Sequence, residues 1–229
     1  MGKIKFGSFV VDMRNKVGGT VYSKNRGGAY TKNKVSPAQP RTSAQTTARS
    51  RMTTFAQGFR ALTATQIAAW NSAVSAFQKT DIFGDLKSPS GINLYCKLNI
   101  NLAQVGVAAI TTPPLPIGVV GPVTLTPAAA AGAATFTLAF TVSPVPANTV
   151  WLLQATQQLS PGRSSVNSFY RSFSTIAAAG TSPANIAAAY TAKFGTLVAG
   201  QKIFIKVIPV SSTTGIKGQA ITVSTIVAA

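Results

Sequence analysis

The stretch Thr135-Phe-Thr-Leu-Ala-Phe-Thr-Val142 alternates strictly between small residues and large apolar ones. Because successive side chains of a β-strand point to opposite faces, Phe136, Leu138, Phe140 and Val142 share one face, and this face has to be buried. Further stretches rich in β-branched and aromatic residues lie between turn residues at 150–155, 169–174, 201–207 and 220–227. These patterns predict a C-terminal body of short strands.

The sequence that surrounds this strand is uncharged. From Lys97 to Arg163 the chain runs 65 residues without a charged side chain. A neutral segment rich in Thr, Val and Ala has to bury itself in a compact domain. It is not a transmembrane helix, because the five prolines from Pro113 to Pro127 leave no uninterrupted run of the ~20 apolar residues that a bilayer requires.

The end of the chain resembles a known sandwich family. Residues 197–203, a strand over 204–210, a turn over 211–215 and a last strand are similar to the F strand, loop and G strand of a fibronectin-III domain. The sequence departs from that family at Ile203, where the family has the tyrosine of its corner. About seven strands in roughly 110 residues is also the size of an immunoglobulin-like domain. The resemblance implies an immunoglobulin-like all-β sandwich over residues 122–229.

The N-terminal part of the chain is strongly basic. Its first sixty residues carry twelve Lys and Arg against one acid, Asp12. Gly18-Gly19 and Gly27-Gly28 bracket residues 20–24, and residues 29–34 follow, which predicts two short strands joined around Asn25 to Gly28. Isolated two-stranded ribbons are marginal in water, so we expect residues 1–41 to form an extended basic β-hairpin arm that orders only against a partner.

Alternation along the two strands divides the arm into faces. Tyr22 and Lys24 share one face of their strand, and Tyr30, Lys32 and Lys34 share one face of theirs. Whether these faces coincide depends on the register that the loop sets. If they coincide, aromatic rings and lysines form one phosphate-facing strip. Alternatively, this is a solvated basic arm whose tyrosines pack on a neighbouring subunit.

Two helices are predicted after the stiff connector at residues 36–41. Thr42 or Ser43 can cap the first helix, whose apolar positions are Ala48, Met52, Phe55 and Phe59. Thr63 and Gln66 match a capping box, which is followed at helical spacing by Ile67, Trp70, Val74 and Phe77. The pattern predicts antiparallel helices joined near Ala61-Leu62, with their aromatic residues at the seam.

The region after the second helix completes the predicted organisation. Residues 92–105 fit a helix better than a strand, although both periods are present. Residues 106–121 are rich in Pro and Gly and are predicted as a linker. The fold class is therefore α+β: an extended basic arm at 1–41, a small helical hairpin region at 42–105, the linker at 106–121 and the sandwich at 122–229.

The composition excludes most enzymes. The acids are Asp12, Asp81 and Asp85, there is no Glu and no His, and Cys96 is the single cysteine. Acid-base catalysis, zinc sites and a Ser-His-Asp arrangement cannot be assembled from these residues. Cys96 lies among apolar neighbours and is interpreted as a packing residue. We therefore expect a protein that is not an enzyme and that uses no cofactor and no metal.

The formal net charge of +18 indicates an anionic partner. A membrane is a poor candidate, because Phe6 stands where a myristoylation motif needs Ser or Thr. The apolar run that follows Lys3 and Lys5 is too short for a secretory signal, which favours synthesis in the cytoplasm. Nucleic acid or an acidic protein lattice remains.

The first hundred residues also resemble an uncharacterised group of small proteins from Bacteroidota and their phages, a match that extends over residues 1–105. The matching residues are Gly2-Lys3-Ile4, 18–22, 28–30, 40–42, Ala44-Gln45, Arg49, Leu62-Thr63, Gln66, Ala69-Trp70, Ser90-Gly91, Leu94-Tyr95 and Leu98-Asn99. The resemblance implies a phage or prophage structural protein and names no functional residue. The sandwich is likewise similar to the immunoglobulin-like modules that decorate phage heads and tails.

These observations lead to a structural hypothesis. We expect a virion protein of a tailed bacteriophage, an auxiliary or decoration capsid protein in multiple copies, whose basic arm meets the major capsid protein or packaged DNA. DNA binding would be independent of sequence, because no base-reading module is present. The expected contacts to phosphate or to an acidic capsid surface are Lys24, Arg26, Lys32, Lys34, Arg41, Arg49, Arg51 and Arg60.

Two other functions remain open. One is an architectural protein that coats nucleic acid without a capsid. The other is a tail or adhesion module whose sandwich binds a cell-surface glycan. Glycan binding by an adhesion module would require exposed aromatic residues in the loops at 160–163 and 211–215, and neither loop contains one.

Overall fold

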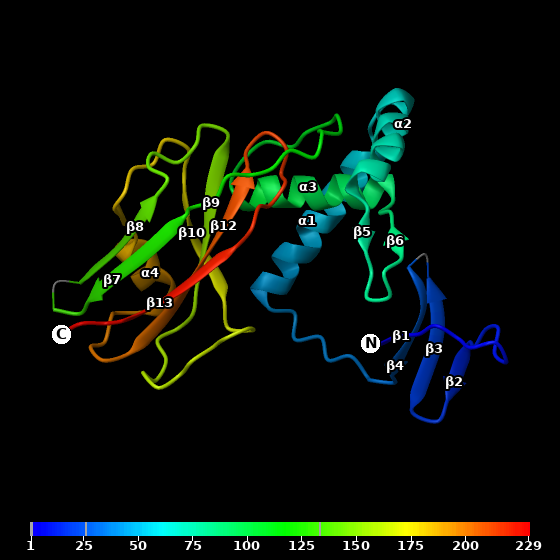
Figure 1. Cartoon of the computed structure of the whole chain (residues 1–229), viewed down its shortest axis with the longest axis horizontal. Coiled ribbons are helices and arrows are strands. Elements are labelled where there is room, and N and C mark those ends of the chain that lie inside the picture. Colours follow the sequence, from blue (N-terminus) through cyan, green and yellow to red (C-terminus); the bar gives the residue numbers. More distant parts are fainter. Residues whose placement is uncertain (1, 26, 133) are drawn as a thin grey trace. The chain divides into compact units, whose positions relative to one another are not determined.

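The computed structural model describes residues 2–25, 27–132 and 134–229 and has a mixed α+β architecture. Its contacts divide the chain into two compact units (Figure 1). Unit 1 comprises residues 1–50 and Lys79–Lys87, and unit 2 comprises Arg51–Gln78 and Ser88–Ala229. The predicted linker and sandwich, and most of the predicted helical region, therefore lie together in unit 2.

Unit 1 contains a four-stranded antiparallel sheet with the order β1-β4-β3-β2 and a two-stranded sheet of β5 and β6. The strands are β1 (Gly2–Lys3), β2 (Asn15–Val17), β3 (Thr20–Asn25), β4 (Gly28–Asn33), β5 (Lys79–Thr80) and β6 (Leu86–Lys87). Both predicted strands are present as β3 and β4. The ribbon is not two-stranded, however, because β1 and β2 extend it on both sides. These added strands have two and three residues, too short for alternation to reveal.

The register of β3 and β4 decides how the aromatic and basic residues are arranged. Tyr22 pairs with Thr31, and Tyr30 pairs with Ser23. Directly opposed residues of antiparallel strands share a face, so Tyr22 and Lys24 lie on one face while Tyr30 and Lys32 lie on the other. The single strip of tyrosines and lysines, which depended on this register, does not form.

The three predicted helices begin and end close to their expected positions, and a fourth helix was not predicted. They are α1 (Ser43–Arg60), α2 (Ala64–Ala73) followed by a 3-10 turn (Val74–Phe77), α3 (Gly91–Gln104) and α4 (Ala187–Phe194). Thr63 and Gln66 form the predicted capping box at the start of α2. Ser90 caps α3, which confirms the helical interpretation of residues 92–105. Gly106 follows α3 with a φ of 73°, in the left-handed region that favours glycine.

The aromatic residues of the helical part of unit 2 meet on α3. The Tyr95 ring lies 5.2 Å from the Trp70 ring and 5.5 Å from the Phe59 ring, measured between centroids. Trp70 is fully buried, and Leu94 and Leu98 complete the cluster. The predicted seam between the first two helices is therefore a core that is shared with α3, whose Tyr95 was not included in the prediction.

Residues 106–121 are irregular, but their contacts hold them against the helices. The buried Asn99 side chain accepts a hydrogen bond from the Ile110 backbone N–H at 2.7 Å and donates to the Ile110 carbonyl at 3.1 Å. Trp70 Nε1 donates to the Thr111 carbonyl at 2.7 Å. Asn101 fixes a loop of the β body in the same way, by donating to the Gly215 carbonyl at 2.8 Å. Buried amide side chains thus join the helices to the rest of unit 2.

The β body consists of two antiparallel sheets with one core between them (Figure 1). One sheet has the order β11-β8-β7, and the other has the order β10-β9-β12-β13. The strands are β7 (Thr124–Ala130), β8 (Thr135–Thr141), β9 (Thr149–Ala155), β10 (Arg171–Ile176), β11 (Ala184–Asn185), β12 (Lys202–Ser211) and β13 (Ile221–Ile226). Ala228 pairs with Ala130 and connects the sheets at one edge.

The core contains the apolar face of residues 135–142, from which this strand was predicted. Phe136, Leu138 and Phe140 are buried in it, and the Phe140 ring meets the Trp151 ring of the opposite sheet at 4.7 Å. Val142 is the exception, because it lies beyond the end of β8 and is 38% exposed. Alternation therefore identified the buried face correctly, but not where the strand ends.

Helix α4 was not predicted, and it supplies a central core residue. Tyr190 is fully buried, and its ring packs edge-on against Phe136 at 5.1 Å. Its hydroxyl donates to the Thr156 carbonyl at 3.0 Å, so its polar end is satisfied. Burial raises the pKa of the Tyr190 hydroxyl, which keeps this donor protonated.

We predict that Asn99→Ala destabilises unit 2 by about 1–3 kcal/mol, because two part-buried backbone groups of Ile110 lose their partner. Urea unfolding followed by circular dichroism measures the change. Asn93→Ala is the matched control, since Asn93 is exposed on the same helix. Equal stabilities of the two variants would contradict the role of Asn99.

Candidate functional site

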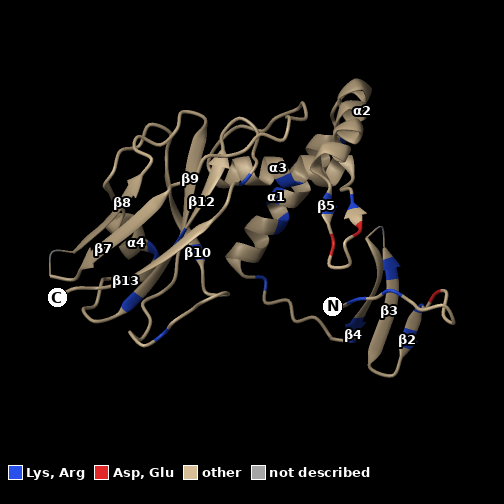
Figure 2. Ribbon diagram, in the orientation of Figure 1, with Lys and Arg blue, Asp and Glu red and all other residues tan. Residues whose placement is uncertain are grey.

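All three acids of the chain are paired with cations inside unit 1. Asp81 bonds Lys3 at 3.0 Å, Asp85 bonds Lys5 at 3.1 Å, and Asp12 bonds Arg14 at 2.9 Å. Lys87 also approaches Asp85 at 3.9 Å. Figure 2 shows that acids occur only on elements of unit 1, whereas cations occur throughout the chain. No carboxylate is therefore left over for the other cations.

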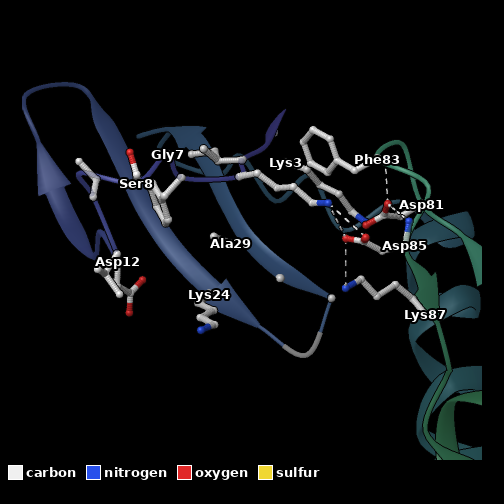
Figure 3. Close-up of a pocket in the computed structure, with 17 residues that line it drawn as sticks. Lys3, Gly7, Ser8, Asp12, Lys24, Ala29, Asp81, Phe83, Asp85 and Lys87 are labelled. Carbon is white, nitrogen blue, oxygen red and sulfur yellow. Dashed lines mark hydrogen bonds and ion pairs between the residues drawn. The ribbon is translucent and has the colours of Figure 1, made fainter.

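The loop between β5 and β6 is organised by Asp81. Its side chain, 5% exposed, accepts hydrogen bonds from the backbone N–H groups of Phe83 at 2.8 Å and Asp85 at 3.2 Å. The bond from Lys3, followed by the bond from the Phe83 N–H, lowers the pKa of this carboxyl. Figure 3 shows Lys3 and Lys87 extending toward the two carboxylates of this loop. The arrangement fastens the N-terminal strand to residues 79–87.

An open cavity of about 490 Å³ lies beside these ion pairs (Figure 3). Four lysines and three aspartates line it, so its charges are almost balanced. Of the predicted contact residues that the structure describes, Lys24 alone lines it. Within residues 2–25, 27–132 and 134–229, no group of three His, Cys, Asp or Glu side chains could hold a metal ion. A polyanion would therefore bind less favourably in this nearly neutral cavity than at the lysines that lie outside it.

The other predicted contact residues are spread over exposed parts of the chain. Lys32 and Lys34 line a second hollow of about 690 Å³. Arg41 precedes α1, and Arg49 on α1 donates to Gln39 at 3.0 Å. Arg51 and Arg60 belong to α1 within unit 2, where Arg60 is exposed and Arg51 is half-buried. Arg26 lies outside the described residues.

Unit 1 has no apolar core of its own. Among its described residues no apolar side chain is fully buried. Several large ones are largely exposed instead, including Phe9 at 100%, Val11 at 93% and Ile82 at 76%. Hydrogen bonds and ion pairs, rather than apolar burial, therefore hold unit 1 together.

Unit 2 contains a basic surface whose residues were not among the predicted contacts, although six cations without an acid in the sandwich had left open that the body also faces an anionic partner. Arg163 stacks over Phe169 at 4.9 Å, Lys202 over Phe204 at 5.2 Å and Lys206 over Tyr170 at 5.7 Å. Phe169 is 47% exposed and belongs to the segment that follows the loop at 160–163. The sequence does show Lys202, Phe204 and Lys206 alternating on one side of a strand. It does not show that the aromatic residues Phe169 and Tyr170 of another segment lie beside them.

Two further features of the chain bear on its chemistry. Cys96 is buried, and burial raises the pKa of its thiol, which disfavours a reactive thiolate. None of the helices within the described ranges combines the length and the apolar character needed to cross a bilayer.

Comparison of the chain with protein-family models, with curated proteins and with solved structures finds no match. The functional assignment therefore depends on the residues and their geometry.

We predict that Lys3 controls the titration of Asp81. The folded-state pKa of Asp81 lies below its ordinary value of 3.8, so its stabilising effect is complete above that pH and is lost as the pH falls through the lower folded value. Lys3→Gln should shift the midpoint, followed by NMR of the Phe83 amide, upward toward 3.8. Lys5→Gln is the control, because Lys5 pairs with Asp85. An unchanged midpoint in Lys3→Gln would contradict this prediction.

Proposed function

We propose that the chain is a structural protein of a tailed-phage virion, an auxiliary or decoration capsid protein present in multiple copies. Unit 1 would anchor it to the major capsid protein or against packaged DNA. The observation that carries the proposal is that unit 1 has no buried apolar side chain among its described residues and exposes Phe9, Val11 and Ile82. A surface of this kind becomes stable when a neighbouring molecule covers it.

The charge of unit 1 supports the same proposal. It carries twelve Lys and Arg against three Asp, and all three Asp are already paired. Lys24, Lys32, Lys34, Arg41 and Arg49 are exposed. In the described part of the chain none of these five forms an ion pair. An anionic partner, either a polynucleotide or an acidic capsid surface, would neutralise this excess.

The β body fits a decoration module. We propose that it is an immunoglobulin-like, fibronectin-III-like sandwich. Seven antiparallel strands in a three-stranded and a four-stranded sheet around a common core support this assignment. The resemblance of the first hundred residues to small proteins from Bacteroidota and their phages supports the virion role. The shortage of acids and the lack of His support a non-enzymatic role.

The virion role predicts that the protein is found in particles. Induction of the source bacterium, purification of the particles by density gradient and mass spectrometry should detect this chain in a fixed ratio to the major capsid protein. A host membrane or ribosomal protein serves as the contamination control. Absence of this chain from well-purified particles would refute the virion role.

Anchoring of unit 1 predicts a difference between free and assembled protein. Trypsin should cut the free chain first within residues 1–50, where exposed Lys and Arg are frequent, and should leave residues 88–229 intact for longer. In purified particles the same sites should be protected. Resistance of residues 1–50 in the free monomer would contradict the anchoring proposal.

The second candidate is a nucleic-acid architectural protein without a capsid, which the surplus of unpaired cations favours. Under this alternative the free protein should coat duplex DNA, and its affinity should fall steeply with ionic strength. A virion protein should instead need a shell partner for its assembly. Filament formation on DNA without any partner would favour the alternative.

A further inference from the structure

One face of the four-stranded sheet of unit 2 combines cations with aromatic rings. On β12, Lys202 and Lys206 alternate with Ile203, Ile205 and Val207, which belong to the core. The two lysines therefore lie on the outer face of the sheet, about 13 Å apart along the strand. We call this surface the cation–aromatic face, and it comprises Arg163, Phe169, Tyr170, Lys202 and Lys206, while the Phe204 ring is buried beneath Lys202.

The segment that leads into β10 supplies the other half of this face. Lys202 Nζ donates to the Arg163 carbonyl at 2.9 Å, which fixes this segment beside β12. Leu159 and Lys202 also exchange backbone hydrogen bonds at 2.8 and 2.9 Å. Phe169 is thus held beside Arg163 and Tyr170 beside Lys206, and the 47% exposure of Phe169 leaves part of its ring open to a ligand.

The positive charge of this region has no internal counter-ion. Unit 2 contains no Asp or Glu, because the last acid of the chain is Asp85. Lys217 donates a hydrogen bond to the Gln104 side-chain oxygen at 2.8 Å. Burial, and then repulsion from Lys206 and Lys97, lowers the pKa of Lys217. These lysines are close enough to repel one another, and a bound anion would relieve that repulsion.

We propose that the cation–aromatic face binds single-stranded nucleic acid independently of sequence. Lys202, Lys206 and Arg163 contact the phosphates, and a base stacks on the exposed ring of Phe169. Proteins that bind single strands without sequence preference combine these two features, a basic surface that follows the backbone and aromatic platforms for the bases. An acidic protein segment would use the cations but not the ring. The inference does not rest on the virion role.

The tryptic map of the chain allows a direct test. Cleavage at Arg163 and Arg171 releases the peptide Ser164–Arg171, which carries both Phe169 and Tyr170. Ultraviolet cross-linking of the full-length protein to oligo(dT), followed by mass spectrometry, should identify this peptide. Cross-links confined to residues 1–50 would overturn the proposal.

Variants give a second readout, by fluorescence anisotropy with oligo(dT) and with duplex DNA. Phe169→Ala should weaken single-strand binding about fivefold or more and change duplex binding less than about twofold. Lys206→Gln should reduce the salt slope for oligo(dT) by about 0.7. Lys193→Gln, which removes one exposed charge from α4, is the matched control. Circular dichroism verifies that each variant is folded.

Three outcomes would overturn the proposal. Equal effects of Lys206→Gln and Lys193→Gln would mean that net charge alone attracts the oligonucleotide. An unchanged affinity of Phe169→Ala would remove the stacking contact. Competition by polyglutamate as effective as competition by unlabelled oligo(dT) would identify an acidic protein segment as the ligand. The outcome for the virion role is independent of these binding experiments, because the protein composition of purified particles tests it.

Discussion

The scarcity of carboxylates is the constraint on which the rest of this protein depends. Three aspartates serve 21 Lys and Arg, and all three are used within unit 1, where they bond Lys3, Lys5 and Arg14. Unit 2 consequently folds without any acidic side chain. Several of its cations lie over aromatic rings or donate to carbonyl oxygens, which stabilises a positive charge without neutralising it.

The two units are stabilised in different ways. Unit 2 has two apolar clusters, one around Tyr95 of α3 and one between the sheets, and buried amides such as Asn99 hold its irregular segments in place. Unit 1 has short strands, an Asp81-centred loop and apolar side chains that face solvent. Because apolar burial supplies most of the free energy of folding, unit 1 should open more readily than unit 2.

Local patterns predicted much of this fold. Alternation identified the buried face of β8, and the Thr63–Gln66 capping box located the start of α2. Properties set by distant residues were not accessible. The register of β3 and β4 depends on the geometry of their loop, and α4 is an Ala-rich segment among strands whose position follows from burial of Tyr190. For the candidate site, the sequence marked single basic residues, but it could not bring Phe169 beside Arg163.

Unit 1 is assembled from two separate stretches, so the backbone passes between the units three times, at Ser50–Arg51, Gln78–Lys79 and Lys87–Ser88. The first passage lies inside α1. A pulling force on unit 1 is therefore shared by three covalent connections in parallel, and one severed peptide bond leaves two of them intact. This connectivity gives the link between the units a mechanical redundancy that one flexible tether lacks.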